Sequence, residues 1–419
     1  MPLASIRRSG PHAGGDVSSG TAAAAEHVGL YVHFPFCTVR CPYCDFAVDT
    51  RREIPHDRYA AVVTAEIAAR APWFQPPRAA NAPALASVYF GGGTPGLWRP
   101  DALGTVVAAA LQAFDAAPDP AREVTVEANP GEMDDSNLRA LRAAGVNRLS
   151  LGLQALEDRL LRAIGRAPAS DAAAGPAAFR AARAAGFDNV SVDLMFGLPG
   201  QSFDDWRRSV DAVLALAPEH VSAYALTIER GTEFGARARR GDLSLPDDEE
   251  AARMQLWGRD ALAAAGLEQY EVSSYARAGR RAVHNSLYWT GAPYLGVGAS
   301  AASFRPLADG GGWRFTNPRA TDTYLRGAEE GGGSPEPVDV ERRGSADLEN
   351  EAVWLALRTA DGLDRARHAA RYGADPVAAR ADAVSRCVES GWLRVEPQRI
   401  RPTPLGFLFA DEIAARLWL

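Results

Sequence analysis

Short apolar segments alternate with longer segments of helical periodicity over the first 265 residues of the chain. The short segments have the length and composition of β-strands. Six of them are predicted to be strands: Val28–Phe34, Leu85–Phe90, Val124–Ala128, Arg148–Leu153, Asn189–Phe196 and Val221–Leu226. Helices are predicted at Asp57–Ala71, Asp101–Phe114, Asp135–Ala144, Ala155–Ile164, Pro176–Ala185 and Phe203–Leu216. The last helix follows Ser202, which lies three residues before Asp205 and predicts a capping box.

Strands separated by helices in this way imply a parallel sheet with right-handed crossovers. The predicted fold is therefore α/β: a (β/α)6 partial barrel of the TIM type, closed or nearly closed, over residues 26–265. In barrels of this kind the functional residues lie at the C-terminal ends of the strands.

The alternation stops after about residue 265. Residues 266–340 are rich in Gly and Pro and contain short β-like pieces at Tyr270–Ser274 and Val297–Phe304, which predicts an accessory β-rich extension and a linker. Residues 341–419 are predicted to form a small α-rich domain that resembles a winged helix. Its helices mix Arg with Asp and Glu, whereas a helix that reads DNA would be basic, so a lid or partner-docking role is expected.

Composition narrows the possible partners. A chain of 419 residues with 47% hydrophobic residues can bury a large core and has room for two or three domains. The net charge of -7 argues against nucleic-acid binding. None of the 45 basic residues is a lysine, which excludes a P-loop lysine and a Schiff-base lysine for pyridoxal phosphate.

The sequence was also searched for a membrane span and for a secretion signal. No apolar run approaches the ~18 residues that a membrane span needs. Residues 1–25 consist mainly of Gly, Ser, Ala and Pro, have no apolar segment long enough for secretion, and are predicted to be a disordered tail. We therefore expect a cytoplasmic protein, in which thiols stay reduced.

Three of the four cysteines, Cys37, Cys41 and Cys44, follow the first predicted strand at a C-x3-C-x2-C spacing. Three thiolates from one short loop can bind three irons of a [4Fe–4S] cluster, which leaves the fourth iron without a protein ligand. An open metal position is typical of a catalytic or substrate-binding site, because structural sites are normally closed. The fourth cysteine, Cys387, lies in an apolar helical stretch and is expected to be ordinary core.

Two other uses of these cysteines have to be weighed. A disulfide framework is disfavoured, because the remaining cysteine is distant and the chain is long enough to form a core without one. A zinc site is a stronger alternative, since His33 lies four residues before Cys37. However, His33 falls inside a predicted strand, and zinc ligands usually come as two separated pairs, so the cluster is favoured.

Polar residues also mark the ends of the next four strands. The second strand runs into Gly91, Gly92, Gly93 and Thr94, where the glycines would let the backbone approach a ligand, and Thr94 and free N–H groups would bind a carboxylate or amine. The following strand ends carry Glu127, Gln154 and Asp193. Each alone is typical of a local cap, but together, beside a thiolate loop, they indicate a binding site.

The cysteine spacing followed by Gly-Gly-Gly-Thr-Pro resembles the radical S-adenosylmethionine (SAM) proteins. Further motifs, namely Tyr31-Val-His-Phe-Pro-Phe-Cys37, Glu127-Ala-Asn-Pro130, Ser150-Leu-Gly-Leu-Gln154, Gly165-Arg166 and Asp193-Leu-Met-Phe-Gly-Leu-Pro199, are similar to one branch of that superfamily. This branch contains oxygen-independent coproporphyrinogen III oxidase and the heme chaperone HemW family. The resemblance covers roughly residues 28 to 419 and implies a partial barrel of the radical SAM kind.

The resemblance implies a [4Fe–4S] cluster on the three loop cysteines, with the open iron taking the amino and carboxylate groups of SAM. The SAM-contacting positions that it implies are Tyr31, Tyr43, Gly92, Gly93, Thr94, Glu127, Gln154, Arg166 and Asp193. A carboxylate at Glu127 or Asp193 would pair with the sulfonium, the amine or the ribose hydroxyls of SAM, and Arg166 with its carboxylate.

Two features separate the members of this branch. The oxidases carry a further cysteine two residues after the third, where this chain has Phe46. The chaperones carry a motif that appears here as His284-Asn285-Ser-Leu-Tyr288-Trp289, which implies heme binding by His284, Asn285, Tyr288 and Trp289. Imidazole is a good axial ligand for heme iron, and aromatic rings offer apolar faces to a porphyrin.

The motif also has a plainer interpretation, since a single histidine beside aromatic residues is more often packed than ligating. In addition, relatives often have histidines where this chain has Pro168 and Ala302. The second replacement would weaken heme coordination or place it wholly on His284.

The predicted function is therefore a radical-SAM-type heme chaperone that binds a cluster, SAM and heme. Its expected partners are heme or porphyrin, heme-accepting apoproteins and an electron donor. The enzyme alternative is an oxygen-independent coproporphyrinogen III oxidase, which decarboxylates porphyrinogen propionates. A third alternative is a zinc-stabilised binding protein, which would not need the SAM motifs.

Overall fold

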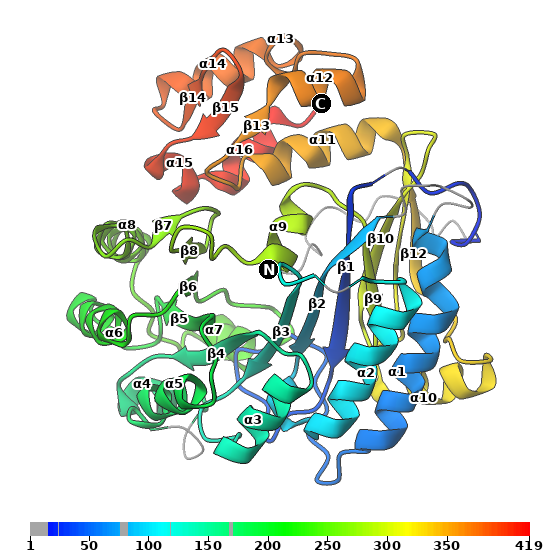
Figure 1. Cartoon of the computed structure of the whole chain (residues 1–419). Helices are drawn as coiled ribbons and strands as arrows, with labels where there is room; N and C mark the ends of the chain where they lie inside the picture. The colour runs from blue at the N-terminus through cyan, green and yellow to red at the C-terminus, as the bar shows by residue number, and fades with distance from the viewer. Residues whose placement is uncertain (1–15, 24, 76–82, 118, 167–170) are drawn as a thin grey trace.

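A twelve-stranded sheet runs through the computed structural model, which describes residues 16–23, 25–75, 83–117, 119–166 and 171–419 (Figure 1). Its strand order is β12-β11-β10-β9-β1-β2-β3-β4-β5-β6-β8-β7. The six predicted strands are confirmed as the parallel run β1 (His27–Phe34), β2 (Ala84–Gly92), β3 (Glu123–Ala128), β4 (Arg148–Gln154), β5 (Val190–Phe196) and β6 (His220–Ala225).

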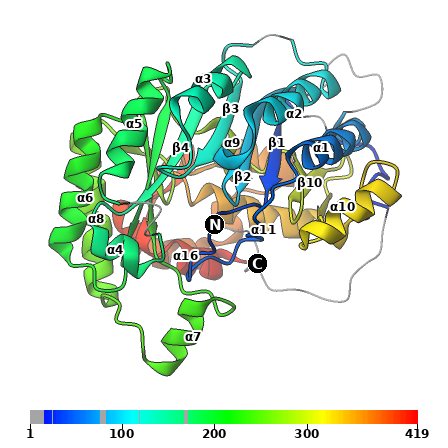
Figure 2. The same cartoon turned by 90° about the horizontal axis from the view of Figure 1, so that it is seen from below.

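Helices follow these strands along the chain, as the sequence predicts. They are α1 (His56–Arg70), α2 (Pro100–Ala113), α3 (Asp135–Ala143), α4 (Asp158–Ala163), α5 (Ala174–Ala184) and α6 (Phe203–Leu216). The predicted capping box of α6 is confirmed, with the Ser202 hydroxyl and the Asp205 carboxylate each accepting from the other residue's backbone N–H. Seen along the strands, the sheet is curved and these helices cover its convex side (Figure 2).

The sheet continues at both edges of this parallel run: antiparallel strands follow β6, whereas one further parallel strand and then antiparallel strands follow β1. Beyond β6, α7 (Glu233–Arg240) and α8 (Asp248–Ala264) lead to the short pair β7 (Glu268–Gln269) and β8 (Ser274–Ala276). Beyond β1 lie β9 (Tyr294–Val297), β10 (Ala302–Pro306), β11 (Gly312–Thr316) and β12 (Val338–Arg343), with α10 (Thr321–Glu330) before β12. Within the described residues β1 and β6 do not pair, so no closed barrel forms.

Three segments differ from the sequence prediction. The β-like piece predicted at Tyr270–Ser274 is the connection between β7 and β8, and only Ser274 belongs to a strand. Val297–Phe304 is not one β piece, because Ser300 takes a positive φ of 63° and turns the chain between β9 and β10. Residues 16–23, assigned to a disordered tail, pack instead against β10: the Arg305 guanidinium donates to the carbonyls of Val17, Ser19 and Gly20. Val17 is buried in an apolar cluster, which explains the order of this segment.

The C-terminal residues build a second, smaller core. The α-rich unit contains α11 (Ser345–Ala356), β13 (Leu363–Asp364), α12 (Arg365–Tyr372), α13 (Pro376–Ala379), α14 (Ala381–Glu389), β14 (Leu393–Val395), β15 (Arg399–Pro402), α15 (Pro404–Leu408) and α16 (Ala410–Leu417). Cys387 is fully buried in its core, as predicted. The division of the chain at residues 265 and 340 stays a prediction.

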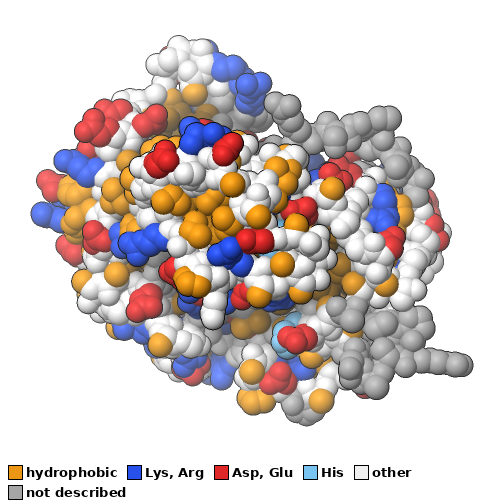
Figure 3. All heavy atoms as spheres, turned by 90° about the horizontal axis from the view of Figure 1, so that it is seen from above, with side chains coloured by type: hydrophobic (Ala, Val, Ile, Leu, Met, Phe, Trp, Pro, Cys, Tyr) orange, Lys and Arg blue, Asp and Glu red, His pale blue; other side chains and the backbone are white. Residues whose placement is uncertain are grey.

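This unit covers the end of the sheet at which β1 begins, with the short helix α9 (Val283–Trp289) between the two (Figure 1). Seen from above, hydrophobic side chains lie on the surface of that face among charged ones (Figure 3). The exposed apolar residues of the C-terminal unit include Leu405, Phe409 and Trp418. No described helix has both the length and the apolar composition needed to cross a membrane.

Candidate functional site

Each strand from β1 to β6 presents one partly exposed polar or tyrosine side chain near its C-terminal half, and the residues next to it are buried except for Ala225 on β6. Because side chains alternate along a strand, the buried neighbours face the helices and these six face the interior of the curved sheet. The six are Tyr31, Tyr89, Glu127, Gln154, Asp193 and Tyr224.

The carboxylate of Glu127 lies at the centre of this group. It accepts a hydrogen bond of 2.7 Å from the Tyr89 hydroxyl and one of 3.2 Å from the Gly92 backbone N–H. Burial raises the pKa of Glu127 to about 7, against the effect of these two donors, and the nearby Asp193 raises it further. The pKa of Asp193 is also raised by burial, while its carboxylate accepts from Ser150. A cationic ligand beside these two buried groups would favour their charged form and offset the effect of burial.

The cysteine loop joins β1 to α1 and is closed at its base by backbone bonds between Cys37 and Asp49 and between Asp49 and Pro35. All three cysteines of the loop are half-buried and unpaired. Burial raises the pKa of Cys37 to about 11, a hydrogen bond from Thr94 opposes this, and the other two thiols raise it further. Thiolates on one short loop would repel one another, so a bound cation would favour their ionisation.

A chain of polar contacts connects this loop to Arg166. Cys37 Sγ lies 3.5 Å from Thr94 Oγ1, and the Asn129 side-chain amide donates to the same hydroxyl at 3.0 Å. The Arg166 guanidinium donates to the Asn129 carbonyl oxygen, but its Nε is buried with no partner. Tyr43 lies beside Arg166, and burial raises the pKa of this phenol to about 12 although the guanidinium lowers it.

The glycine run has a different role from the one expected. The N–H groups of residues 92–94 are not free, since Gly92 donates to Glu127, Gly93 to the Phe34 carbonyl and Thr94 to the Phe36 carbonyl. A Cβ at Gly92 would lie 2.5 Å from the His33 ring, and one at Gly93 would lie 2.7 Å from the Phe36 carbonyl oxygen. These glycines therefore let β2 pack against the start of the cysteine loop.

The end of β4 is also crowded. Gln154 has a positive φ of 64°, which a residue other than glycine rarely adopts and which is often found at functional sites. A Cβ at Gly152 would lie 2.9 Å from Gln154 Nε2 and 3.1 Å from Asn129 Oδ1. The missing side chain at Gly152 thus lets Gln154, Asn129 and Arg166 meet.

His33 does not take part in a metal site. Its Nε2 lies 3.0 Å from the Ala47 carbonyl and its Nδ1 lies 3.1 Å from the Tyr31 hydroxyl, so both ring nitrogens are bonded. In the part of the chain that the structure describes, no three His, Cys, Asp or Glu side chains converge closely enough to hold a metal ion. This contradicts a compact zinc site. A [4Fe–4S] cube places each thiolate on a different iron, so it does not need convergence on one point, and the donor set fits it.

Comparison with known proteins shows to which family the chain belongs. The Radical SAM superfamily matches residues 31–213, and the HemN C-terminal domain matches residues 345–409. The Heme chaperone HemW of Mycobacterium tuberculosis is 37% identical over 393 residues, which cover 93% of this chain and 94% of that protein. This chain belongs to the HemW family of radical SAM proteins.

Two further proteins show the extent of the family and of the fold. The mitochondrial Radical S-adenosyl methionine domain-containing protein 1 of Bos taurus is 40% identical over 312 residues, which cover 74% of this chain and 67% of that protein. The structure of coproporphyrinogen III oxidase (HemN) from Escherichia coli covers 95% of this chain and 91% of its own, with a TM-score of 0.77 and 22% identity. The second likeness shows the shared fold alone.

The segment that resembles the HemW motif forms α9, at the opposite end of the sheet from the cysteines. His284 is 1% exposed. Its Nδ1 lies 2.8 Å from the Ser87 hydroxyl and its Nε2 lies 2.8 Å from the Tyr288 hydroxyl. Burial lowers the pKa of His284 to about 3, so the ring is neutral. Both nitrogens that would ligate an iron are therefore already bonded.

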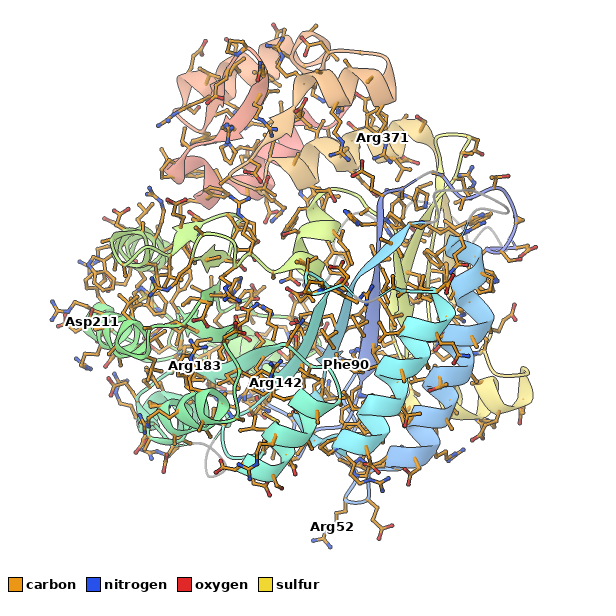
Figure 4. The ribbon with its side chains drawn as sticks, in the orientation of Figure 1. Arg52, Phe90, Arg142, Arg183, Asp211 and Arg371 are labelled. Carbon is orange, nitrogen blue, oxygen red and sulfur yellow. The ribbon has the colours of Figure 1, made fainter. Side chains whose placement is uncertain are left out.

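The other motif residues lie closer to the surface. Asn285, Tyr288 and Trp289 are partly exposed, and Trp289 Nε1 has no hydrogen-bond partner. Tyr288 also lines a cavity of about 30 Å³ below the C-terminal unit, together with Arg371 and Tyr372. Figure 4 shows Arg371 at this end of the molecule and Arg52, which follows the cysteine loop, at the other.

Three positions at which relatives carry a cysteine or a histidine lie in different parts of the chain. Phe46 lies on the cysteine loop and is 54% exposed. Ala302 begins β10, pairs with Thr316 and offers no ligating atom. Pro168 lies outside the described residues.

Sequence reasoning missed Asn129, Tyr89 and Tyr224. Asn129 lies within the Glu-Ala-Asn-Pro motif, and an amide at a strand end next to Glu127 was the available signal. Tyr89 and Tyr224 lie inside apolar strand segments. The available signal was the alternation of each tyrosine with apolar neighbours, which places the tyrosine on the opposite face of the strand from those neighbours.

Proposed function

We propose that this chain is a radical-SAM-type heme chaperone, which binds a [4Fe–4S] cluster and SAM and delivers heme to acceptor proteins. The observation that carries the proposal is the 37% identity to a heme chaperone HemW over 93% of this chain. The half-buried thiols beside an arginine with an unpartnered Nε support the cluster and SAM parts independently.

Cys37, Cys41 and Cys44 would hold the cluster. When bound, the cluster would offer its open iron to the amino and carboxylate groups of SAM and supply one-electron chemistry. The chain itself does the orienting. Thr94 is 3% exposed and is fixed by Asn129, so the wall next to Cys37 is rigid before any ligand arrives.

Arg166 is the residue best suited to the SAM carboxylate. Its guanidinium is anchored by Asn129 on one side, and its buried Nε points to no protein acceptor. A buried donor without an acceptor costs free energy, and a carboxylate ligand would remove that cost. Glu127 and Asp193 would face the positively charged part of SAM, with Tyr31, Tyr43, Gly92, Gly93 and Gln154 as further lining residues.

The heme role of His284, Asn285, Tyr288 and Trp289 is proposed on the HemW motif. For His284 Nε2 to reach an iron, the Tyr288 hydroxyl has to leave it, and α9 has to become accessible from the C-terminal unit. Heme-accepting proteins and an electron donor complete the proposed set of partners.

The test is anaerobic reconstitution with iron, sulfide and SAM, followed by heme and, separately, coproporphyrinogen III. We expect about four irons per chain, bound SAM, a defined Soret band and no protoporphyrinogen. Turnover of coproporphyrinogen III would instead assign the chain to the oxidases. Stoichiometric zinc without labile sulfide would refute the cluster.

A further inference from the structure

Tyr89 stands outside the set of residues assigned to SAM above, yet its hydroxyl donates a hydrogen bond to one of them. Its side chain projects from β2 toward the partly exposed interior of the sheet. Its hydroxyl donates to Glu127 Oε1 at 2.7 Å, while Glu127 Oε2 accepts from the Gly92 N–H. Each oxygen of the carboxylate thus has one donor from the protein, and the two donors fix its plane.

The ring of Tyr89 is held as firmly as its hydroxyl. It stacks on His284, with ring centroids 5.0 Å apart, and on Tyr31, with centroids 6.2 Å apart. A Cβ at Gly91 would lie 3.0 Å from both tyrosine rings and 3.2 Å from Glu127 Oε1. The first glycine of the run therefore leaves the space that this contact needs, because any larger residue would push Tyr89 away from Glu127.

Besides the two hydrogen-bond donors, two charged groups affect the ionisation of Glu127. Asp193, on β5, opposes ionisation of Glu127, and Arg148, on β4, favours it. Three other tyrosines lie close enough to Glu127 for its charge to affect them: Tyr31, Tyr224 and Tyr288. Burial raises the pKa of each well above 10, so all three stay neutral. A hydrogen bond to the charged form favours that form, so the Tyr89 hydroxyl lowers the pKa of Glu127 and opposes the effect of burial.

We propose that Tyr89 is a positioning residue for SAM, whose hydroxyl favours the charged form of the Glu127 carboxylate and aims it at the ligand. The proposal rests on the proposed function, in that Glu127 is taken to contact SAM. Tyr89 itself acts through Glu127 and not on the ligand.

The test uses Tyr89→Phe, which keeps the stacked ring and removes only the hydroxyl. Tyr324→Phe is a matched control, because Tyr324 also donates at 2.7 Å to a buried glutamate, Glu66, which lies on α1 and outside the proposed SAM-binding set. Calorimetry on cluster-reconstituted, heme-free protein between pH 6.5 and 9 measures the SAM affinity. At pH 7 we expect Tyr89→Phe to bind SAM roughly tenfold more weakly, with the deficit shrinking toward pH 9, where Glu127 ionises without help.

The control should lose stability but keep the wild-type SAM affinity and pH profile. A Tyr89→Phe profile that coincides with wild type, while Glu127→Gln abolishes binding, would overturn this proposal alone. A cluster-loaded wild type that does not bind SAM would overturn the proposed function with it. A deficit of equal size at every pH would also refute the proposal, because it would indicate general damage and not loss of the charge on Glu127.

Discussion

The two ends of the sheet carry polar groups that differ in how completely their atoms are already bonded. At the C-terminal end, three half-buried thiols are unpaired and Arg166 Nε has no acceptor. At the other end, His284 is buried and each of its nitrogens has a partner at 2.8 Å. Both regions carry family motifs, but only the first offers free ligating atoms in this conformation. A motif identifies the family, whereas burial and hydrogen bonding tell which atoms are ready to bind.

A second histidine sharpens this comparison. His220 lies between the Ser191 hydroxyl at Nδ1 and the Tyr270 hydroxyl at Nε2, both at 2.8 Å. His284 has the same arrangement with Ser87 and Tyr288. A serine–histidine–tyrosine set therefore occurs twice near the starts of the strands. His220, unlike His284, does not lie in a motif that implies heme binding.

The anchoring of α9 explains why His284 is so well fixed. The Glu123 carboxylate, at the start of β3, accepts from the backbone N–H groups of Val283 and His284. Tyr270 accepts from the Ala282 N–H. The helix thus closes the end of the partial barrel where the C-terminal unit sits, and any heme bound there has to displace part of this network.

The largest expected effect is at the cysteine loop. Cys37→Ala, Cys41→Ala and Cys44→Ala should each abolish cluster binding, because a cube held by three thiolates loses one of them. Iron and labile sulfide analysis after anaerobic reconstitution measures this. Cys387→Ala should leave the iron content unchanged, since this thiol is buried in the C-terminal core. Retention of a full cluster in any of the three variants would contradict the assignment.

The next effect is at Arg166. Arg166→Lys keeps a positive charge but loses the planar donors that pair with a carboxylate, so SAM affinity should fall by about 1.5–3 kcal/mol. Calorimetry with cluster-loaded protein measures the change. Arg159→Lys is a suitable control, because its guanidinium pairs with Asp205 at the start of α6 and does not contact Asn129. Unchanged affinity in Arg166→Lys would show that the unpartnered Nε does not meet SAM.

His284→Ala and His220→Ala compare the two histidines directly. Each removes two buried hydrogen bonds and leaves a cavity, so both should lower the free energy of unfolding by about 2–4 kcal/mol. Only His284→Ala should alter the Soret band of heme-loaded protein if the HemW motif ligates iron. Equal spectra in the two variants would give His284 a purely structural role and leave the heme ligand elsewhere in the chain.

The sequence predicted the parallel strands, the α6 capping box and the position of the cysteine loop, because strand periodicity and turn chemistry are local. Which atoms are free was not predictable. The N–H group of Gly92 is bonded to Glu127 on β3 and that of Gly93 to Phe34 at the end of β1, so both depend on how the strands pack together. In the same way, the partners of His284 come from Ser87 and Glu123, which lie 197 and 161 residues away along the chain.

The smallest expected effect is the pH dependence of stability from Glu127. Burial raises its pKa from 4.5 to about 7, so the folded protein favours the protonated form. Its contribution to stability is then fully present below about pH 4.5 and is lost as pH rises through about 7. Glu127→Gln stays neutral throughout, so urea denaturation of the cluster-free protein should show the variant gaining stability relative to wild type between pH 5 and pH 8. A difference that stays constant with pH would mean that Glu127 titrates normally, and that neither its burial nor Tyr89 controls its charge.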